Sequence, residues 1–291
     1  MTTIPEPTSP TPTFQVRHLD VQGTLRDSVE ALIAVEVDGA GPIPFAIAPH
    51  ESMMLSVQFG RGADPIEEKG EHGSNTRLTG IRQWTGSFDG AGNCISLFAL
   101  LTPLGAVQLL DSQPLEPLPR IRAPLAALLE RGHTRELESR IVLAGGLDAK
   151  LESFAGWLEA RATDRRRQSS AALRAGRAAM RLRAEPNLGV DEIADEQHVS
   201  RRQLERDFRR WIGTSPRHLA QVARVQHVSR LARSGASLAH IAADAGFADQ
   251  AHMSRVVREM TGLTPMHFVR SQRTPLASGF RAATGGGTVY L

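Results

Sequence analysis

The sequence VSRRQLERDFRRWIGTSP at residues 199–216 has a later counterpart, GFADQAHMSRVVREMTGLTP at residues 246–265. Each stretch predicts a tight turn followed by a helix that begins at a capping residue and ends at glycine, with Thr and Pro shortly after. A short helix is predicted before each turn, at 191–195 and at 237–244. The region 193–270 therefore contains two tandem copies of one helical unit.

In the first copy, Ser200 is the expected helix cap, and apolar residues recur at three- to four-residue spacing after it. Leu204, Phe208 and either Trp211 or Ile212 are expected to face inward. The opposite, exposed face then carries Arg201, Arg202, Glu205, Arg206 and Arg209. A helix of about twelve residues with an exposed arginine face fits the major groove of B-DNA.

In the second copy, Asp249 is the expected cap, and Met253, Val256 or Val257, and Met260 are expected to face inward. Its outward face carries Gln250, Ala251, Ser254, Arg255 and Arg258. Gln pairs well with adenine and Arg with guanine, so this face also suits base recognition. It carries fewer basic residues than the first.

Between the copies, Ser215 and Pro216 open a run without helix breakers that ends at residue 233. A helix of this length would span roughly 27 Å. It could hold the two outward faces about one duplex turn apart, on successive major grooves.

Charge divides the chain into two unequal parts. Residues 165–273 contain 20 basic residues, all Arg, against 10 Asp and Glu, whereas the remainder has 14 Lys and Arg against 21 acids. The planar guanidinium suits phosphates and guanine edges. The C-terminal part is therefore expected to seek a polyanion.

These residues also resemble the DNA-binding domain of AraC/XylS-type transcriptional regulators. The resemblance is carried by Ile193, Ala194, Ser200, Leu204, Arg206, Phe208, Arg209, GTSP at 213–216, Arg224, Ser237, Leu238, Ile241, Ala242, GFAD at 246–249, His252, Arg255 and GLTP at 262–265. It implies seven helices in two helix-turn-helix subdomains, with base contacts from the third and sixth helices. Those contacts map onto Arg202, Glu205, Arg206, Gln250, Ala251, Ser254 and Arg255. The sequence departs from the family pattern at Leu219, Ala251, Met253 and 256–258.

The N-terminal part has a different pattern. Short apolar runs at 32–37, 45–48, 53–59 and 94–101 are separated by Gly, Pro, Asp and Asn, which is typical of a β-rich sandwich or barrel. Runs at 125–130, 137–144 and 151–161 have helical spacing. The fold class is thus α+β in two domains: a Pro/Thr-rich disordered leader (1–13), a β-rich regulatory domain (14–164) with helices in 121–161, an all-α DNA-binding domain with two helix-turn-helix subdomains (165–273), and a flexible tail (274–291).

Similar regulators carry an N-terminal domain that binds a small effector, dimerises, or both. The helical stripe of Leu147, Leu151, Phe154 and Leu158 could form a dimer seam or cover the sheet. No ligand-binding residues are predicted.

Enzyme chemistry is not expected. The single Cys94 lies in an apolar run, which favours a packed thiol over a nucleophile, and excludes an internal disulfide. His18, His50 and His72 lack the spacing of a metal site, and Trp84 is expected in the core of a strand rather than in a pocket. No metal or cofactor is predicted.

The sequence thus predicts a cytoplasmic, sequence-specific transcriptional regulator that binds double-stranded DNA. RNA polymerase, a small-molecule effector and a second copy of the chain are further candidate partners; no membrane partner is expected. Three alternatives stay open: a ligand-independent DNA-binding protein whose N-terminal domain only contacts proteins, a nonspecific architectural protein, and an alkyl-transfer enzyme fused to a DNA reader.

Overall fold

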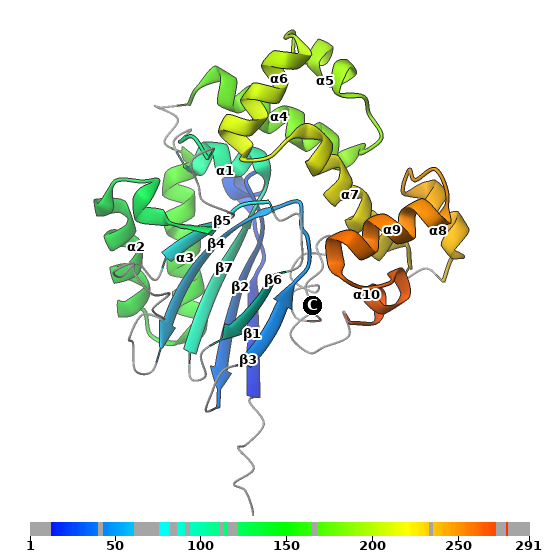
Figure 1. Ribbon diagram of the computed structural model, residues 1–291. Coiled ribbons are helices and arrows are strands. Elements are labelled where there is room, and N and C mark those ends of the chain that lie inside the picture. Colours follow the sequence, from blue (N-terminus) through cyan, green and yellow to red (C-terminus); the bar gives the residue numbers. More distant parts are fainter. Residues whose placement is uncertain are drawn as a thin grey trace, which may run out of the picture.

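The computed structural model of the 291-residue chain has a β-sheet in its N-terminal half and helices in its C-terminal half (Figure 1). It describes residues 13–39, 43–60, 76–81, 86–90, 94–110, 113–115, 122–163, 168–232, 235–271 and 278. His72, Trp84, nearly all of the predicted leader, and the predicted tail apart from Ser278 lie outside the described residues.

The N-terminal half forms a six-stranded antiparallel sheet with strand order β1-β2-β7-β4-β5-β8, and a separate two-stranded sheet β3-β6. The strands are β1 (Thr13–Leu19), β2 (Val29–Asp38), β3 (Ile43–Ile47), β4 (Met53–Gly60), β5 (Thr76–Thr79), β6 (Gly86–Gly90), β7 (Cys94–Leu101) and β8 (Arg122–Pro124). The strands predicted at 32–37, 53–59 and 94–101 lie within these elements, and the one predicted at 45–48 overlaps β3.

Strand β2 is buried on both faces. Leu32 and Ala34 belong to the main core, whereas Ile33 and Val35 belong to a smaller apolar cluster on the other face of the sheet. Because successive side chains of a strand point to opposite faces, two-sided burial needs an unbroken apolar run. This accounts for the continuous apolar sequence at 32–35.

Three helices accompany the sheet: α1 (Pro103–Leu109), α2 (Arg131–Leu143) and α3 (Gly146–Thr163). Helix α3 packs against β1 and β2. Its residues Leu151, Phe154 and Leu158 are buried in the core. Of the two roles considered for this stripe, covering the sheet is confirmed for these three residues.

The helix predicted at 125–130 is wrong. Residues 122–124 form β8, which pairs with β5, and only Leu125–Ala127 makes a short 3₁₀ turn. Leu125, Leu128 and Leu129 are nevertheless buried. A short apolar run with helical spacing can equally cover the end of a sheet. Because β8 pairs with β5 as far as Pro124, too few residues remain after it for an α-helix.

The C-terminal half is helical. Its elements are α4 (Ser170–Ala184), α5 (Val190–Glu196), α6 (Arg201–Asp207), a π-helical turn (Phe208–Ile212), α7 (Pro216–Leu231), α8 (Leu238–Asp244), α9 (Gln250–Thr261) and α10 (Pro265–Ser271). In Figure 1, α4, α5 and α6 lie together at the top, α8, α9 and α10 lie together at the right, and α7 runs between the two groups.

Helix α4 packs against both halves of the protein. One side contacts α1, and the other contacts α6, α7 and the π-helical turn. A Cβ atom on Gly176 would lie 3.0 Å from the Cα of Leu104, so the backbones of α4 and α1 approach closely. Buried alanines along α4, including Ala172, Ala175 and Ala179, permit this packing. The domain boundary predicted at 164/165 falls outside the described residues and stays a prediction.

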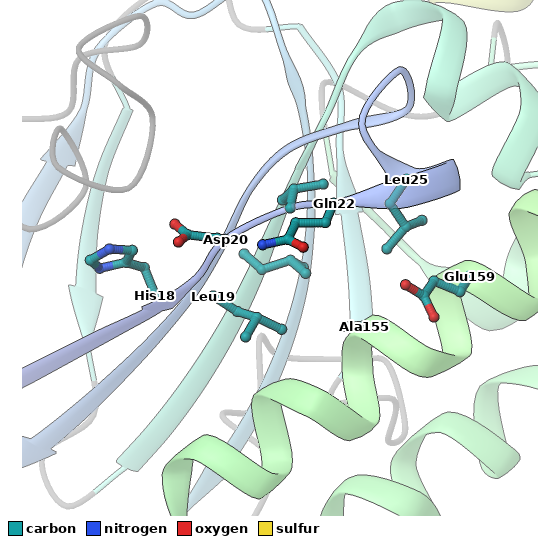
Figure 2. A pocket seen from close by; sticks show the side chains of 9 residues that line it. His18, Leu19, Asp20, Gln22, Leu25, Ala155 and Glu159 are labelled. Atoms are coloured by element: carbon teal, nitrogen blue, oxygen red, sulfur yellow. The ribbon is translucent and has the colours of Figure 1, made fainter.

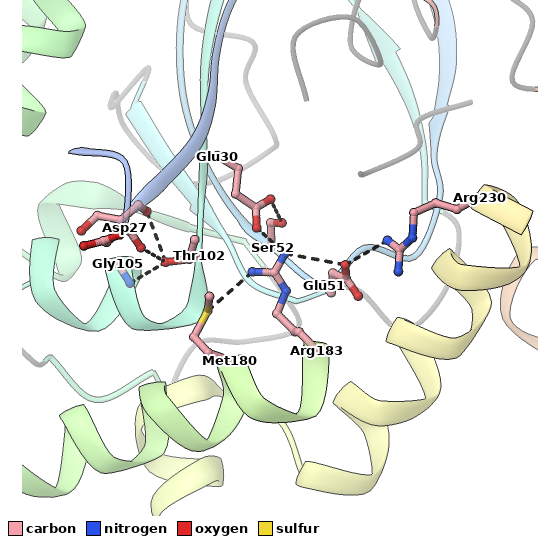
Figure 3. A network of polar contacts seen from close by, with 10 residues as sticks. Asp27, Glu30, Glu51, Ser52, Thr102, Gly105, Met180, Arg183 and Arg230 are labelled. Atoms are coloured by element: carbon pink, nitrogen blue, oxygen red, sulfur yellow. Dashed lines mark hydrogen bonds and ion pairs between the residues drawn. The ribbon is translucent and has the colours of Figure 1, made fainter. Parts of the chain in front are cut away.

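A partly buried charge cluster also joins the two halves; it consists of Glu30, Glu51, Arg183 and Arg230 (Figure 3). Arg183 of α4 pairs with Glu30 of β2 and, at 3.6 Å, with Glu51 of the segment before β4. Arg230 of α7 lies 3.3 Å from Glu51, and Ser52 donates a hydrogen bond of 2.5 Å to Glu30. Two acids of the N-terminal half are thereby matched by two arginines of the C-terminal half.

Candidate nucleic-acid interface

The two tandem units share one turn geometry. In each, the short helix ends in a residue of left-handed conformation, His198 (φ 55°) after α5 and Gly246 (φ 77°) after α8. The next backbone N–H returns to the helix, from Val199 to the carbonyl of Ala194 at 3.0 Å and from Phe247 to that of Ala242 at 2.9 Å. These bonds satisfy carbonyl groups that the helix end would otherwise leave unpaired.

The second turn is one residue longer than the first. Ser200 caps α6 directly after Val199, whereas Ala248 separates Phe247 from Asp249, the cap of α9. Glycine at 246 signals a left-handed position, but His198 does not, since few non-glycine residues adopt one. Its conformation was therefore not foreseen.

The first reader helix consists of α6 and the π-helical turn that follows it. Ser200 Oγ accepts a hydrogen bond of 3.2 Å from the backbone N–H of Gln203, which confirms the predicted cap. The helix ends at Gly213, in left-handed conformation at φ 76°. The predicted inward residues Leu204 and Phe208 are buried.

The π-helical turn departs from the regular helix that was expected. Gly213 N–H donates to the carbonyl of Phe208 at 3.1 Å, a bond spanning five residues instead of four. This wider turn places both Trp211 and Ile212 in the core, where a regular helix was expected to bury one of them.

The predicted outward residues of the first reader lie on one exposed surface. Arg201, Arg202, Arg206 and Arg209 are exposed, Ser200 is exposed at the cap, and Glu205 is half-buried. Arg201 pairs with Asp191 at 3.1 Å and with Glu205 at 3.0 Å. The hydrogen bond that Arg201 donates to Glu205 raises the pKa of Arg201, and the charges of the two acids raise it further.

Among the described residues, Arg202 forms no hydrogen bond or ion pair. Its side chain is therefore available to a ligand.

The second reader helix is α9. Asp249 accepts a hydrogen bond of 2.6 Å from the N–H of His252, so the predicted cap is confirmed. The predicted inward residues Met253, Val256, Val257 and Met260 are all buried. Gln250, Ala251, Arg255 and Arg258 are exposed, and Ser254 is half-buried. The residues that depart from the family pattern at 219, 253, 256 and 257 are buried, so these departures preserve an apolar core.

Helix α7 connects the two readers. It begins at Pro216, as predicted, and the structure shows Ser215 as its cap; its 16 residues span about 24 Å. The readers are also linked through the loop before α5, where Arg224 donates to the carbonyl of Pro186 at 3.0 Å and Asn187 lies against Gly246. Sequence reasoning missed this second link because the residues are far apart in the chain.

The other residues singled out in the N-terminal half do not assemble a catalytic site. Cys94 is buried, as predicted for a packed thiol, and accepts a hydrogen bond from Gln58 at 3.7 Å. His50 is fully buried, whereas His18 is exposed. Within the described segments, no three His, Cys, Asp or Glu side chains are grouped as metal ligands would be.

An open pocket of about 490 Å³ lies between the end of β1, the following loop and α3 (Figure 2). Its lining includes His18, Asp20 and Gln22 near β1, Leu25 and, from α3, Glu159. The volume lies within the range of small-molecule sites, about 300–1,000 Å³. Neither periodicity nor a motif indicates this pocket, because it is assembled from residues 18–25, Leu32 of β2 and two residues of α3.

Comparison with known proteins identifies the C-terminal region. A helix-turn-helix domain model matches residues 193–271. The HTH-type transcriptional regulator GbdR of Pseudomonas aeruginosa is 33% identical over 89 residues, which make up 30% of this chain and 24% of that regulator. Residues 193–271 form an AraC-type helix-turn-helix domain. The match to GbdR spans about a quarter of that regulator's length.

Two solved structures resemble the chain. A transcriptional regulator of Chromobacterium violaceum with an AraC-type DNA-binding domain is 28% identical, with a TM-score of 0.33, over 35% of this chain and 94% of its own. ToxT of Vibrio cholerae is 10% identical, with a TM-score of 0.42, over 89% of this chain and 98% of its own. No helix in the described part of the chain combines the length and apolar character needed to cross a bilayer.

Proposed function

We propose that this protein is a sequence-specific DNA-binding transcriptional regulator of the AraC/XylS type, acting in the cytoplasm. The observation that carries the proposal is the pair of capped reader helices in the AraC-type domain, each with a buried apolar stripe and an exposed polar face. Helices presented in this way enter successive major grooves.

In this mechanism, arginines and helix N-termini anchor phosphates while outward side chains read base edges. Arg202, Glu205 and Arg206 read the first box, and Gln250, Ala251, Ser254 and Arg255 read the second. Ser200, Arg201, Arg209 and Arg258 complete the contact surface.

The proposal is tested by selecting bound sequences from a random duplex library with the full-length chain. The expected motif has two short boxes about 10 base pairs apart. Arg206→Ala should weaken binding to that site by about 1–3 kcal/mol and binding to random DNA little. Equal losses on both would make Arg206 a phosphate contact.

The N-terminal half supplies regulation in this proposal, through a small effector, a second copy of the chain or contact with RNA polymerase. The pocket beside α3 supports the effector, and its acids Asp20 and Glu159 favour a ligand with positive charge. Gln22→Trp, at an exposed position of the pocket, should abolish a ligand-induced rise in melting temperature during a metabolite screen. Uniformly null results from the wild-type chain would contradict an effector at this pocket.

A second candidate is a ligand-independent or architectural DNA-binding protein whose N-terminal half only contacts other proteins. The extensive packing of α4 against α1 supports it, because it couples the halves without a ligand. Binding to competitor DNA within about tenfold of the best selected site would favour the architectural protein, whereas uniformly null calorimetry against metabolites would favour the ligand-independent one.

A further inference from the structure

A continuous chain of hydrogen bonds leads from α4 to the exposed Arg206. Arg174 donates to Asp207 Oδ2 from Nε at 3.0 Å and from Nη2 at 2.6 Å. Gln203 donates from Nε2 to the other carboxylate oxygen, Oδ1, at 2.7 Å. Arg206 then donates from Nη2 to Gln203 Oε1. Asp207 thus accepts hydrogen bonds both from Arg174 of α4 and from Gln203 of α6.

Helical spacing brings these groups together on α6. Residues three and four positions apart lie on the same face, and Gln203, Arg206 and Asp207 have this relation. Burial differs along the chain of bonds, since Asp207 is 3% exposed whereas Arg206 is exposed. The series of hydrogen bonds is therefore fixed inside the protein at Asp207, and it ends at Arg206 on the exposed face of the first reader helix.

Asp207 dictates which way the Gln203 amide faces. An ionised carboxylate only accepts hydrogen bonds, so the amide nitrogen of Gln203 must point toward it. The amide oxygen is then left to accept from the Arg206 guanidinium, whose other N–H groups remain available to a base edge.

We propose that Asp207 is a positioning residue for base recognition, which acts through Gln203 to hold the Arg206 side chain in its reading orientation. The inference rests on the proposed function of Arg206 as a base reader. A long side chain that is ordered before binding loses less conformational entropy when it contacts DNA. Asp207 itself lies too deep to reach a base.

The second reader lacks this arrangement. Val256 occupies the position that corresponds to Asp207, and it is buried among apolar residues. His252 corresponds to Gln203, and its ring stacks edge-on against Phe247 with 5.6 Å between centroids. Arg255, the counterpart of Arg206, forms no hydrogen bond or ion pair within the described segments. Of the two corresponding arginines, Arg206 is thus held by a hydrogen bond before DNA binds, and Arg255 is not so held within the described segments.

The test uses Asp207→Asn in the full-length chain. Asn keeps the shape and can still accept from Arg174, but its amide N–H₂ then faces Gln203 and turns that amide so that N–H groups meet Arg206. Discrimination at the one base position read by Arg206 should fall roughly three- to tenfold, the range expected for ordering one long side chain. Binding to random DNA should stay within about twofold of wild type.

The matched control is Glu196→Gln, which removes the charge of a carboxylate on α5 that pairs with Arg181 of α4 and has no connection to Arg206. It should leave base discrimination unchanged. Gln203→Met, at a half-buried position, removes the amide while leaving Asp207 and Arg174 paired, and it should reproduce the loss even where Asp207→Asn lowers stability.

Introducing Asp207→Asn into a chain that already lacks the Arg206 side chain separates a positioning role of Asp207 from an effect on folding. In an Arg206→Ala chain, Asp207→Asn should have no further effect on discrimination. Loss of discrimination at all positions of the site, or a loss that persists without Arg206, would overturn the proposal.

A measurement on the free protein tests the positioning role of Asp207 without relying on DNA binding. In NMR spectra of the free chain, the Arg206 guanidinium should be rigid in wild type and mobile in Gln203→Met. If library selection yields no motif, the proposal of sequence-specific binding fails, while an already mobile wild-type guanidinium would reject the positioning role independently.

Discussion

The carboxylate of Glu51 lies 3.6 Å from Arg183 on α4 and 3.3 Å from Arg230 on α7, so one side chain of the N-terminal half contacts two helices of the C-terminal half. The Glu51 side chain is only 6% exposed. The position of α7, the helix that connects the two readers, is thereby tied to the segment before β4.

Arg183→Met should lower the free energy of unfolding by about 3–5 kcal/mol at pH 7, because it leaves the buried Glu51 and the partly buried Glu30 with one cation fewer. Urea titration monitored by circular dichroism measures this. The deficit should shrink in acid, because protonation neutralises the unpaired carboxylates. A deficit below 1 kcal/mol, or one that grows in acid, would contradict this role of Arg183.

Glu51→Gln should change how stability depends on pH. Burial raises the pKa of Glu51 above its ordinary value of 4.5, against the opposing influence of Arg183 and Arg230. The stabilising contribution of the protonated carboxyl is complete below pH 4.5 and is lost as the pH rises through the folded-state pKa. As the pH rises above 4.5, the wild-type chain should therefore lose stability relative to Glu51→Gln.

Parallel urea titrations of the two chains across this pH range provide the measurement. A wild-type chain that instead gains stability relative to Glu51→Gln would mean that the two arginines outweigh burial.

The two readers should contribute unequally to DNA affinity. Replacing Arg202 and Arg206 by Ala should weaken binding to the selected site more than replacing Gln250 and Arg255, because each well-placed arginine–guanine pair contributes about 1–3 kcal/mol and the first reader has the denser arginine face. Gel-shift titrations at fixed salt compare the pairs. Arg201→Ala is the control with a smaller expected loss, since Asp191 and Glu205 already pair with it. The reverse ranking of the two double variants would refute the asymmetry.

Gly246→Ala should destabilise the fold through two effects. Its φ of 77° is strained for a side chain by about 1–2 kcal/mol, and a Cβ would also overlap Asn187 Oδ1. Gly235→Ala is the matched control, since Gly235 has the same φ of 77° but no atom within 4 Å of the added Cβ. Gly246→Ala should cost more than Gly235→Ala, and Asn187→Ala should remove the difference. Equal losses would show that Asn187 does not constrain the turn.

The sequence predicted features that depend on nearby residues. The caps Ser200 and Asp249 are predictable because a capping side chain bonds a backbone N–H within one turn. The buried stripes of α6 and α9 follow from helical periodicity for the same reason. The outward faces of both readers were therefore located before their contacts were known.

Features that depend on distant residues were missed. The pairing of Glu30 with Arg183 joins residues 153 positions apart, and no local pattern specifies it. The π-helical turn at 208–212 arises where Trp211 and Ile212 both find space in the core, which depends on helices packed around them. Apolar spacing at 125–130 was also ambiguous, because pairing of β8 with β5 decided its structure.

The double-sided packing of α4 has a practical consequence for protein engineering. A fragment cut at residue 165 would expose the face of α4 that contains Gly176 and normally packs on α1, and would leave Arg183 without its acids. Such a truncated reader should self-associate or require solubilising substitutions on that face. Chimeras that graft this domain onto another sensor should therefore redesign α4 together with the helix that covers it.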